Sequence, residues 1–226
     1  MSEPLLLRLP FEGRWLTQNS PARRVPSHGV DVLGQRYAVD FVGVDDRHRT
    51  AGVRDWRTLV ATEPAERFVS FGRPILAPAA GTVVHVHDGE PDHEARRSQV
   101  ALVGYALGQA GRLRRGPNAV AGNHVVLALP GGHAFVALVH LRAGTLRVRA
   151  GQQVAEGEQL AECGNSGNST QPHVHLQAMD SADLPVARGL PIAFRSFTEW
   201  PRGGGPLARA HGMPAEGSVV APSPGP

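Results

Sequence analysis

The 226-residue chain contains no lysine, a single cysteine and few aromatic residues. Because Cys163 has no second cysteine to pair with, a disulfide within the chain is excluded. No apolar run approaches the roughly 20 residues of a membrane span, so we expect no such span. The amino-terminal stretch 1–15 lacks the apolar segment of a signal peptide. We therefore expect a cytoplasmic protein, unless a removed leader or another export route takes it to the cell envelope or outside the cell.

The charge pattern argues against binding to nucleic acids. All 23 basic residues are arginines, and the formal net charge is only +3. Aromatic residues make up 5% of the chain, and no basic stripe is interleaved with them. Surfaces that bind nucleic acids usually combine a basic patch with aromatic side chains. We predict no nucleic-acid partner.

Glycine and proline divide the sequence into short β-branched runs, which predicts many strands joined by turns. A helical pattern at 94–114 predicts one inserted surface helix, and 45–73 a loop packed over the sheet. We expect one domain over 1–200, followed by a Gly/Pro-rich, disordered tail over 201–226. The expected strands are 36–44, 81–87, 124–129, 134–141 and 174–178.

Two stretches, "ILAPAAGTVVHVHDG" and "LRVRAGQQVAEGEQLAECG", place glycines at tight turns between short strands. This pattern favours a mainly β fold, a barrel-sandwich hybrid or duplicated hybrid motif with an antiparallel β-sheet core. Similar hairpins occur in biotinyl and lipoyl carrier domains, which attach their cofactor to a lysine. Since the chain has no lysine, that function is excluded.

Two His-x-His pairs occur, His85/His87 and His173/His175. Alternate residues of a strand face the same side, so the imidazoles of each pair project together. By spacing alone, an exposed strand face explains either pair equally well. Only the second pair follows a turn-rich segment, "NSGNSTQP", which would set the start of its strand at the lip of a cleft.

Two further titratable residues adjoin apolar strands. Asp40 lies inside "YAVDFVGV", where a lone buried carboxylate is costly unless it meets a cation or hydrogen-bond donors. His140 lies at the end of the apolar run "FVALVHL", just before its last leucine. A buried aspartate with two or three convergent histidines is the ligand set of a zinc site with an open position.

The segments "FVALVHL" and "VRAGQQVAEGEQLAECGNSGNSTQPHVHLQ" resemble the M23 family of zinc metallopeptidases, which includes lysostaphin- and LytM-like endopeptidases. The resemblance covers about residues 10–200. It implies that His175 binds Zn²⁺ and that His140 and His173 are the two active-site histidines that do not bind metal.

The amino-terminal ligands depart from the family pattern, His-x-x-x-Asp, because Arg36 stands where the histidine is expected. The resemblance to a branch with a displaced histidine implies His28 and Asp40 as the other zinc ligands, with Asp31 as the rival carboxylate. Five histidines match no ligand position of the family, and we interpret them as structural: His85, His87, His93, His124 and His133.

The resemblance implies a zinc-dependent endopeptidase that hydrolyses peptide bonds through a metal-activated water, with peptidoglycan cross-links or stem peptides as substrates. His140 or His173 would be the general base, and the other would bind the oxyanion; the sequence leaves the order open. The departure at Arg36 motivates an alternative, a metal-free, inactive M23-like binding or regulatory module. A phosphocarrier resembling the glucose-type IIA domain is a second alternative.

Overall fold

The computed structural model describes residues 3–53, 55–97 and 116–223. The helices of this part are short: α1 (Trp56–Val60), α4 (Pro117–Ala121) and the 3-10 turns η1 (Gln35–Tyr37) and η2 (Ala65–Arg67). The strands are β1 (Leu5–Leu7), β2 (Trp15–Gln18), β3 (Val39–Gly43), β4 (Pro74–Leu76), β5 (Gly81–His87), β6 (Asn123–Ala128), β7 (Phe135–Leu141), β8 (Gln153–Val154), β9 (Gln159–Glu162), β10 (Val174–Met179), β11 (Gly189–Leu190), β12 (Ile192–Trp200), β13 (Leu207–Gly212) and β14 (Val219–Pro222).

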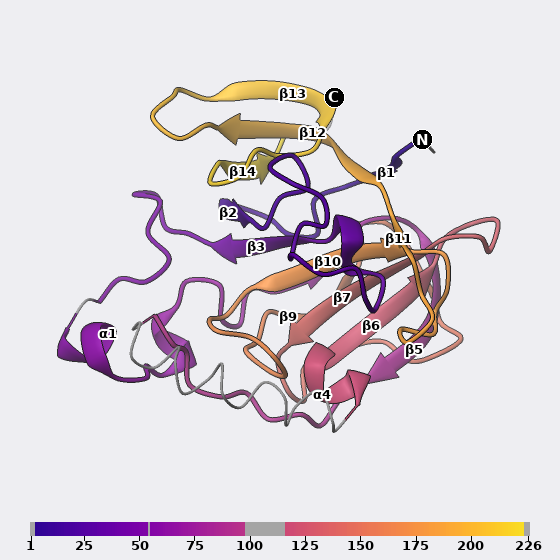
Figure 1. The fold of residues 1–226 in the computed structure, drawn as a ribbon, viewed down its shortest axis with the longest axis horizontal. Helices are drawn as coiled ribbons and strands as arrows, with labels where there is room; N and C mark the ends of the chain where they lie inside the picture. Colours follow the sequence, from indigo (N-terminus) through magenta and orange to yellow (C-terminus); the bar gives the residue numbers. More distant parts are fainter. Residues whose placement is uncertain (1–2, 54, 98–115, 224–226) are drawn as a thin grey trace.

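One large sheet dominates the described residues, in the order β1-β12-β14-β2-β3-β10-β7-β6-β5-β8. In addition, β11 pairs with β10, and β13 pairs with β12, while β4 and β9 form a separate two-stranded sheet. Strand β1 runs parallel to β12, and the other pairings are antiparallel. Strands β12 to β14 lie at one end of the molecule and β5 to β7 at the other, with β3 and β10 between them (Figure 1).

The central strands β3 and β10 are buried along their whole length, so both of their faces are covered. Val39 and Phe41 of β3 point into the main core, where Phe41 lies 5.0 Å from Phe11 and 5.4 Å from Phe194 between ring centroids. Because side chains alternate along a strand, the opposite face of the sheet carries Asp40. That face also holds a smaller apolar cluster, which includes Val126, Ala137, Val139 and Met179.

The predicted mainly β fold with an antiparallel core is confirmed. The predicted strand at 81–87 coincides with β5, and those at 124–129, 134–141 and 174–178 match β6, β7 and β10 within one residue at each end. The strand predicted at 36–44 is shorter, since Gln35–Tyr37 forms η1 and β3 begins at Val39.

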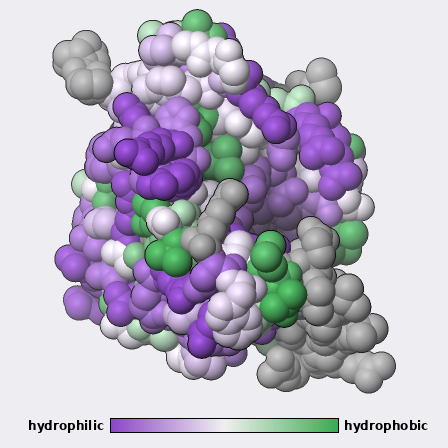
Figure 2. All heavy atoms as spheres, turned by 90° about the vertical axis from the view of Figure 1, so that its left-hand side faces the viewer, coloured by the Kyte–Doolittle hydropathy of each residue, from purple (hydrophilic) through white to green (hydrophobic). Residues whose placement is uncertain are grey.

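The predicted helix at 94–114 lies outside the described residues, apart from 94–97, which are not helical. Ala95 instead forms a β-bridge with Glu63. The expected loop at 45–73 contains α1 and η2. Phe68 is buried, whereas Trp56 of α1 remains 64% exposed. The face that carries α1 is largely hydrophilic, with small separate hydrophobic patches (Figure 2).

The prediction of a disordered tail over 201–226 is wrong for its described part. Leu207–Gly212 forms β13 and Val219–Pro222 forms β14, which lies between β12 and β2. Val219 and Val220 are buried. The glycines and prolines concentrate in the turns before each strand, so composition averaged over the segment hides two runs able to pair. The single domain therefore extends past residue 200.

Across the described residues, no helix combines the length and the apolar character needed to cross a lipid bilayer.

Candidate metal centre

Strand register brings the central candidate residues together. Antiparallel pairing of β3 with β10 sets Asp40 directly opposite His175, and pairing of β10 with β7 sets His175 opposite Val139. Residues directly opposite each other project to the same face of a sheet. His173 lies two residues before His175 and approaches the same carboxylate. Segments far apart in sequence thus deliver these side chains to one face.

His140 reaches the same place by a break in the strand geometry. Its neighbour Val139 already faces the His175 side, so regular alternation would point His140 into the main core. His140 instead has a left-handed backbone, with φ of 63°. Its ring lies 4.8 Å from that of His173 and 6.0 Å from that of His175 between centroids. Such strained conformations cost on the order of 1–3 kcal/mol and cluster at functional sites.

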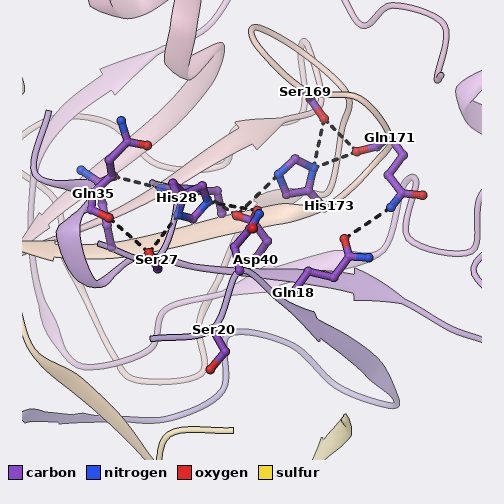
Figure 3. A network of polar contacts seen from close by, with 12 residues as sticks. Gln18, Ser20, Ser27, His28, Gln35, Asp40, Ser169, Gln171 and His173 are labelled. Carbon is purple, nitrogen blue, oxygen red and sulfur yellow. Dashed lines mark hydrogen bonds and ion pairs between the residues drawn. The ribbon is translucent and has the colours of Figure 1, made fainter. Parts of the chain in front are cut away.

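Asp40 is the centre of the group. Its Oδ2 lies 3.1 Å from His28 Nε2, and its Oδ1 lies 2.8 Å from His175 Nδ1. His173 Nε2 is 3.7 Å from Oδ1, and the Asn19 amide donates to Oδ2 at 2.7 Å. His28 and His173 approach the carboxylate from opposite sides (Figure 3). One donor atom from each of His28, Asp40 and His175 lies within 4.8 Å of the others.

The loop before η1 carries His28. Its Nδ1 lies 2.9 Å from Ser27 Oγ, and the Ser27 backbone N–H donates to the Arg36 carbonyl at 3.0 Å. The Arg36 side chain hydrogen-bonds Asp31, and these side chains are 41% and 48% exposed. Asp31 therefore lies outside the group. The imidazole beside Asp40 comes from His28, and not from residue 36, where the family pattern has a histidine and this chain has Arg36.

Neighbouring groups set the proton positions on the rings of two histidines. The Gln177 amide N–H donates to the Leu33 carbonyl at 2.6 Å, so its oxygen faces His175 Nε2 at 2.9 Å. His175 Nε2 must then carry a proton, which leaves Nδ1 as a lone pair in the neutral ring. Likewise, His140 donates from Nδ1 to the Ser166 carbonyl at 2.9 Å and keeps Nε2 unprotonated.

This donor set fits a bound metal ion. A neutral His175 would aim its Nδ1 lone pair at the Asp40 carboxylate from 2.8 Å, which is unfavourable unless a cation or a second ring proton lies between them. Two imidazole nitrogens and one carboxylate oxygen match a catalytic zinc site with one open position. Gln177 and Ser27 hold the outer nitrogens of these rings, as partners of metal-binding histidines commonly do.

Electrostatics keep the carboxylate charged and one histidine neutral. Burial alone would raise the pKa of Asp40, but the charge of His173 and hydrogen bonds with His175 and His28 hold it well below its usual value. Burial, reinforced by repulsion from His173 and His175, lowers the pKa of His140 well below its usual value. The group thus presents an anion beside a neutral imidazole that can accept a proton.

Residues 66–187, more than half of the chain, match the family model described as peptidase family M23. The chain belongs to peptidase family M23. The matched range contains His140, His173 and His175, whereas His28 and Asp40 precede it.

Three relatives illustrate the similarity of this M23 chain to known proteins. A protein of Haemophilus influenzae described as an uncharacterized metalloprotease is 33% identical over 109 residues, which are 48% of this chain and 16% of that protein. The chain thus spans 16% of the length of this curated relative. The catalytic domain of the antimicrobial peptidase lysostaphin from Staphylococcus simulans aligns with a TM-score of 0.40 at 17% identity, over 79% of this chain and 88% of the other. A zinc containing peptidase from Vibrio cholerae aligns with a TM-score of 0.35 at 17% identity, over 68% and 45% of the two chains.

The group around Asp40 borders a cavity of about 240 Å³. Asp40 and the four histidines, His28, His140, His173 and His175, line it, and Leu33, Leu184 and α4 residues Pro117, Val120 and Ala121 add apolar lining. Polar groups also line it, among them Asn168 and Thr170. A cavity with apolar walls and convergent polar groups is typical of a ligand-binding site.

Several polar partners of the group were not predicted from sequence, among them Ser27, Ser166, Gln177 and Asn19. Gln177 lies two residues after His175 on β10, so strand periodicity places it on the same face and could have identified it. Asn19 follows β2 with a left-handed backbone, φ 51°, and no sequence signal marks its contact with Asp40.

The five histidines interpreted as structural lie elsewhere in the M23 fold. His93 contacts the Gly167 carbonyl at 3.0 Å, next to the loop before β10, and His133 is exposed in the β6–β7 turn. His85, His87 and His124 form a separate group on β5 and β6.

Proposed function

We propose that this M23 domain is a zinc-dependent endopeptidase that cleaves peptide bonds in peptidoglycan cross-links or stem peptides. The observation that carries the proposal is the convergence of donor atoms of His28, Asp40 and His175 within 4.8 Å, in a cavity shared with two further histidines. Structural metal sites fill every position with protein ligands, whereas three ligands beside a cavity suit a catalytic ion. Membership of the M23 family supports peptide hydrolysis.

His28, Asp40 and His175 would hold the ion. A zinc ion bound there supplies Lewis acidity, which polarises the peptide carbonyl and lowers the pKa of a water molecule toward about 7. Asp40 is already ionised at neutral pH, so it requires no deprotonation before binding.

His140 and His173 take the two proton-handling roles. Because the Nδ1 of His140 donates to a backbone carbonyl, its Nε2 is an acceptor, and we assign to it the proton of the attacking water. His173 also directs its Nδ1 at a backbone carbonyl, that of Gln171 at 2.8 Å, so a proton on its Nε2 makes the ring a cation. Its Nε2 lies 3.7 Å from the Asp40 carboxylate, and we assign the cationic ring to His173 because the negative charge of Asp40 attracts it. His173 can therefore donate a hydrogen bond to the developing oxyanion.

The test is to incubate zinc-loaded protein with muropeptides and with oligoglycine, and to identify products by mass spectrometry. We expect peptide products in which each cut adds one water, and no products from chelator-treated protein. The exposed His133 provides a matched control, since His133→Ala removes an imidazole outside the cavity and should leave turnover unchanged. A wild-type protein that binds no zinc would favour the metal-free binding module instead. Zinc binding without cleavage of either substrate class would contradict the proposed activity.

Replacement of Gln177 should weaken zinc binding while leaving the ligands in place. Gln177→Leu removes the acceptor that keeps the proton of His175 on Nε2. Loss of such a partner typically lowers metal affinity roughly 10- to 100-fold. Isothermal titration with zinc measures the effect. Gln171→Leu is the matched control, because the Gln171 side chain contacts Gln18 and none of the ligands. Equal affinities of the two variants would contradict this role of Gln177.

A further inference from the structure

A second group of imidazoles lies on the neighbouring strands β5 and β6. The ring of His124 is 5.1 Å from that of His85 and 5.6 Å from that of His87 between centroids, with interplanar angles of 30° and 33°. His87 of β5 is directly opposite His124 of β6 in the antiparallel pair. His85 lies two residues before His87, so its side chain projects to the same face of the sheet. None of the three lines the catalytic cavity.

His124 presents a buried nitrogen without a hydrogen-bond partner. The residue is fully buried, and its Nδ1 lies 2.8 Å from the Gly122 carbonyl. Nδ1 therefore carries the proton, and Nε2 is a lone pair for which the described residues offer no donor. Burial lowers the pKa of His124 to about 4, so the ring is neutral at pH 7. A fixed Nδ1–H with a bare Nε2 is the arrangement of a metal-binding histidine.

His87 also has a buried nitrogen without a hydrogen-bond partner in the described part of the chain. Its Nε2 is buried and has no hydrogen-bond partner among the described residues, with Glu90 Oε1 the nearest acidic atom at 3.7 Å. Its Nδ1 accepts one long contact, 3.4 Å, from the Asn118 amide, so the proton of the neutral ring lies on Nε2. A metal ion can bind this Nε2 once the ring proton moves to Nδ1 and the weak Asn118 contact breaks. A buried polar atom without a partner costs about 1–3 kcal/mol. Two such nitrogens in adjacent rings are poorly explained by a purely structural role.

A ligand has access to this group. His85 and His124 line a cavity of about 310 Å³ together with Asn118 and Asp183. Pro117 and Leu184 line both this cavity and the catalytic one. The second group therefore lies behind a wall of the catalytic cavity.

We propose that His85, His87 and His124 bind a second metal ion, a divalent first-row transition ion of the kind that imidazole ligands favour. His124 supplies Nε2 from a fixed ring, and the other two rings turn toward it. Such rotation is needed because, among the described residues, only the His28, Asp40 and His175 group has its donor atoms within 4.8 Å of one another. It breaks few contacts, since His85 is exposed and the contacts of His87 are long.

The test is equilibrium dialysis of the full chain against zinc, with metal counted by mass spectrometry. We expect two equivalents in the wild type and one in the double variant His85→Ala/His87→Ala, which spares the buried His124 and so preserves the fold. His175→Ala should also retain one equivalent, and combining all three substitutions should leave none. His133→Ala is the matched control and should keep two. Thermal unfolding checks that each variant is folded.

The outcomes separate this inference from the proposed function. A wild type with a single equivalent that His175→Ala removes overturns the second site and leaves the catalytic one intact. Retention of both equivalents by the His85/His87 double variant also overturns it. A single equivalent that is lost only in the double variant would support the second site and contradict the catalytic zinc site.

Discussion

His175→Ala is expected to release zinc from the catalytic cavity and to reduce peptide hydrolysis to the background rate. The substitution removes one of three donors whose atoms lie within 4.8 Å, and it leaves Asp40 facing His28 alone in the proposed ligand set. Because changes to the outer partners of a ligand already cost up to roughly 100-fold in affinity, loss of the ligand itself should cost more. Zinc titration and product analysis on the same preparation measure both effects.

Asp40→Asn tests the same prediction without a change of volume. The carboxylate is buried, and its charge is stabilised by three histidines. The amide removes the charge that a divalent ion needs, so we expect loss of zinc and of hydrolysis from a folded protein. Full activity in either variant, with the fold verified by thermal unfolding, would show that the ion is held elsewhere.

Strand positions and the alternation of side chains could be predicted from sequence because both are local properties. The run of β-branched residues between turns predicts both ends of β5 correctly. The position of Asp40 as a lone carboxylate in an apolar run predicts that it is buried and has polar partners, which the structure confirms. The pairing that sets Asp40 opposite His175 is not local. Those two residues are 135 positions apart, and from sequence only the family resemblance predicts that they lie together.

Features that depend on tertiary packing were not accessible in this way. A regular strand would turn His140 into the core, and nothing in "FVALVHL" announces its left-handed backbone. The strands β13 and β14 were missed because pairing with β12 and β2, rather than composition, orders them. His85 and His87 share their spacing with His173 and His175, and only the buried ring of His124 distinguishes them from an exposed strand face.

The second large effect is expected when either proton-handling histidine is replaced. His140→Asn and His173→Ala should each lower kcat by roughly 10²- to 10⁴-fold, the usual contribution of a general acid or base. Asparagine is chosen at position 140 because it tolerates the left-handed backbone there, so the fold should be maintained. Both variants should retain zinc, because neither residue belongs to the converging donor set.

The pH profile separates the two roles. A general base must be unprotonated, so the wild-type rate should fall as acid protonates it, and the variant that lacks the base should lose this acidic limb. Burial lowers the pKa of His140 and leaves its Nε2 as an acceptor, whereas His173 lies beside the Asp40 carboxylate, so we expect the limb to disappear in His140→Asn and to persist in His173→Ala. The reverse pattern would exchange the two assignments. Unchanged turnover in both variants would remove the histidines from the mechanism, and zinc loss in either would place that residue among the ligands.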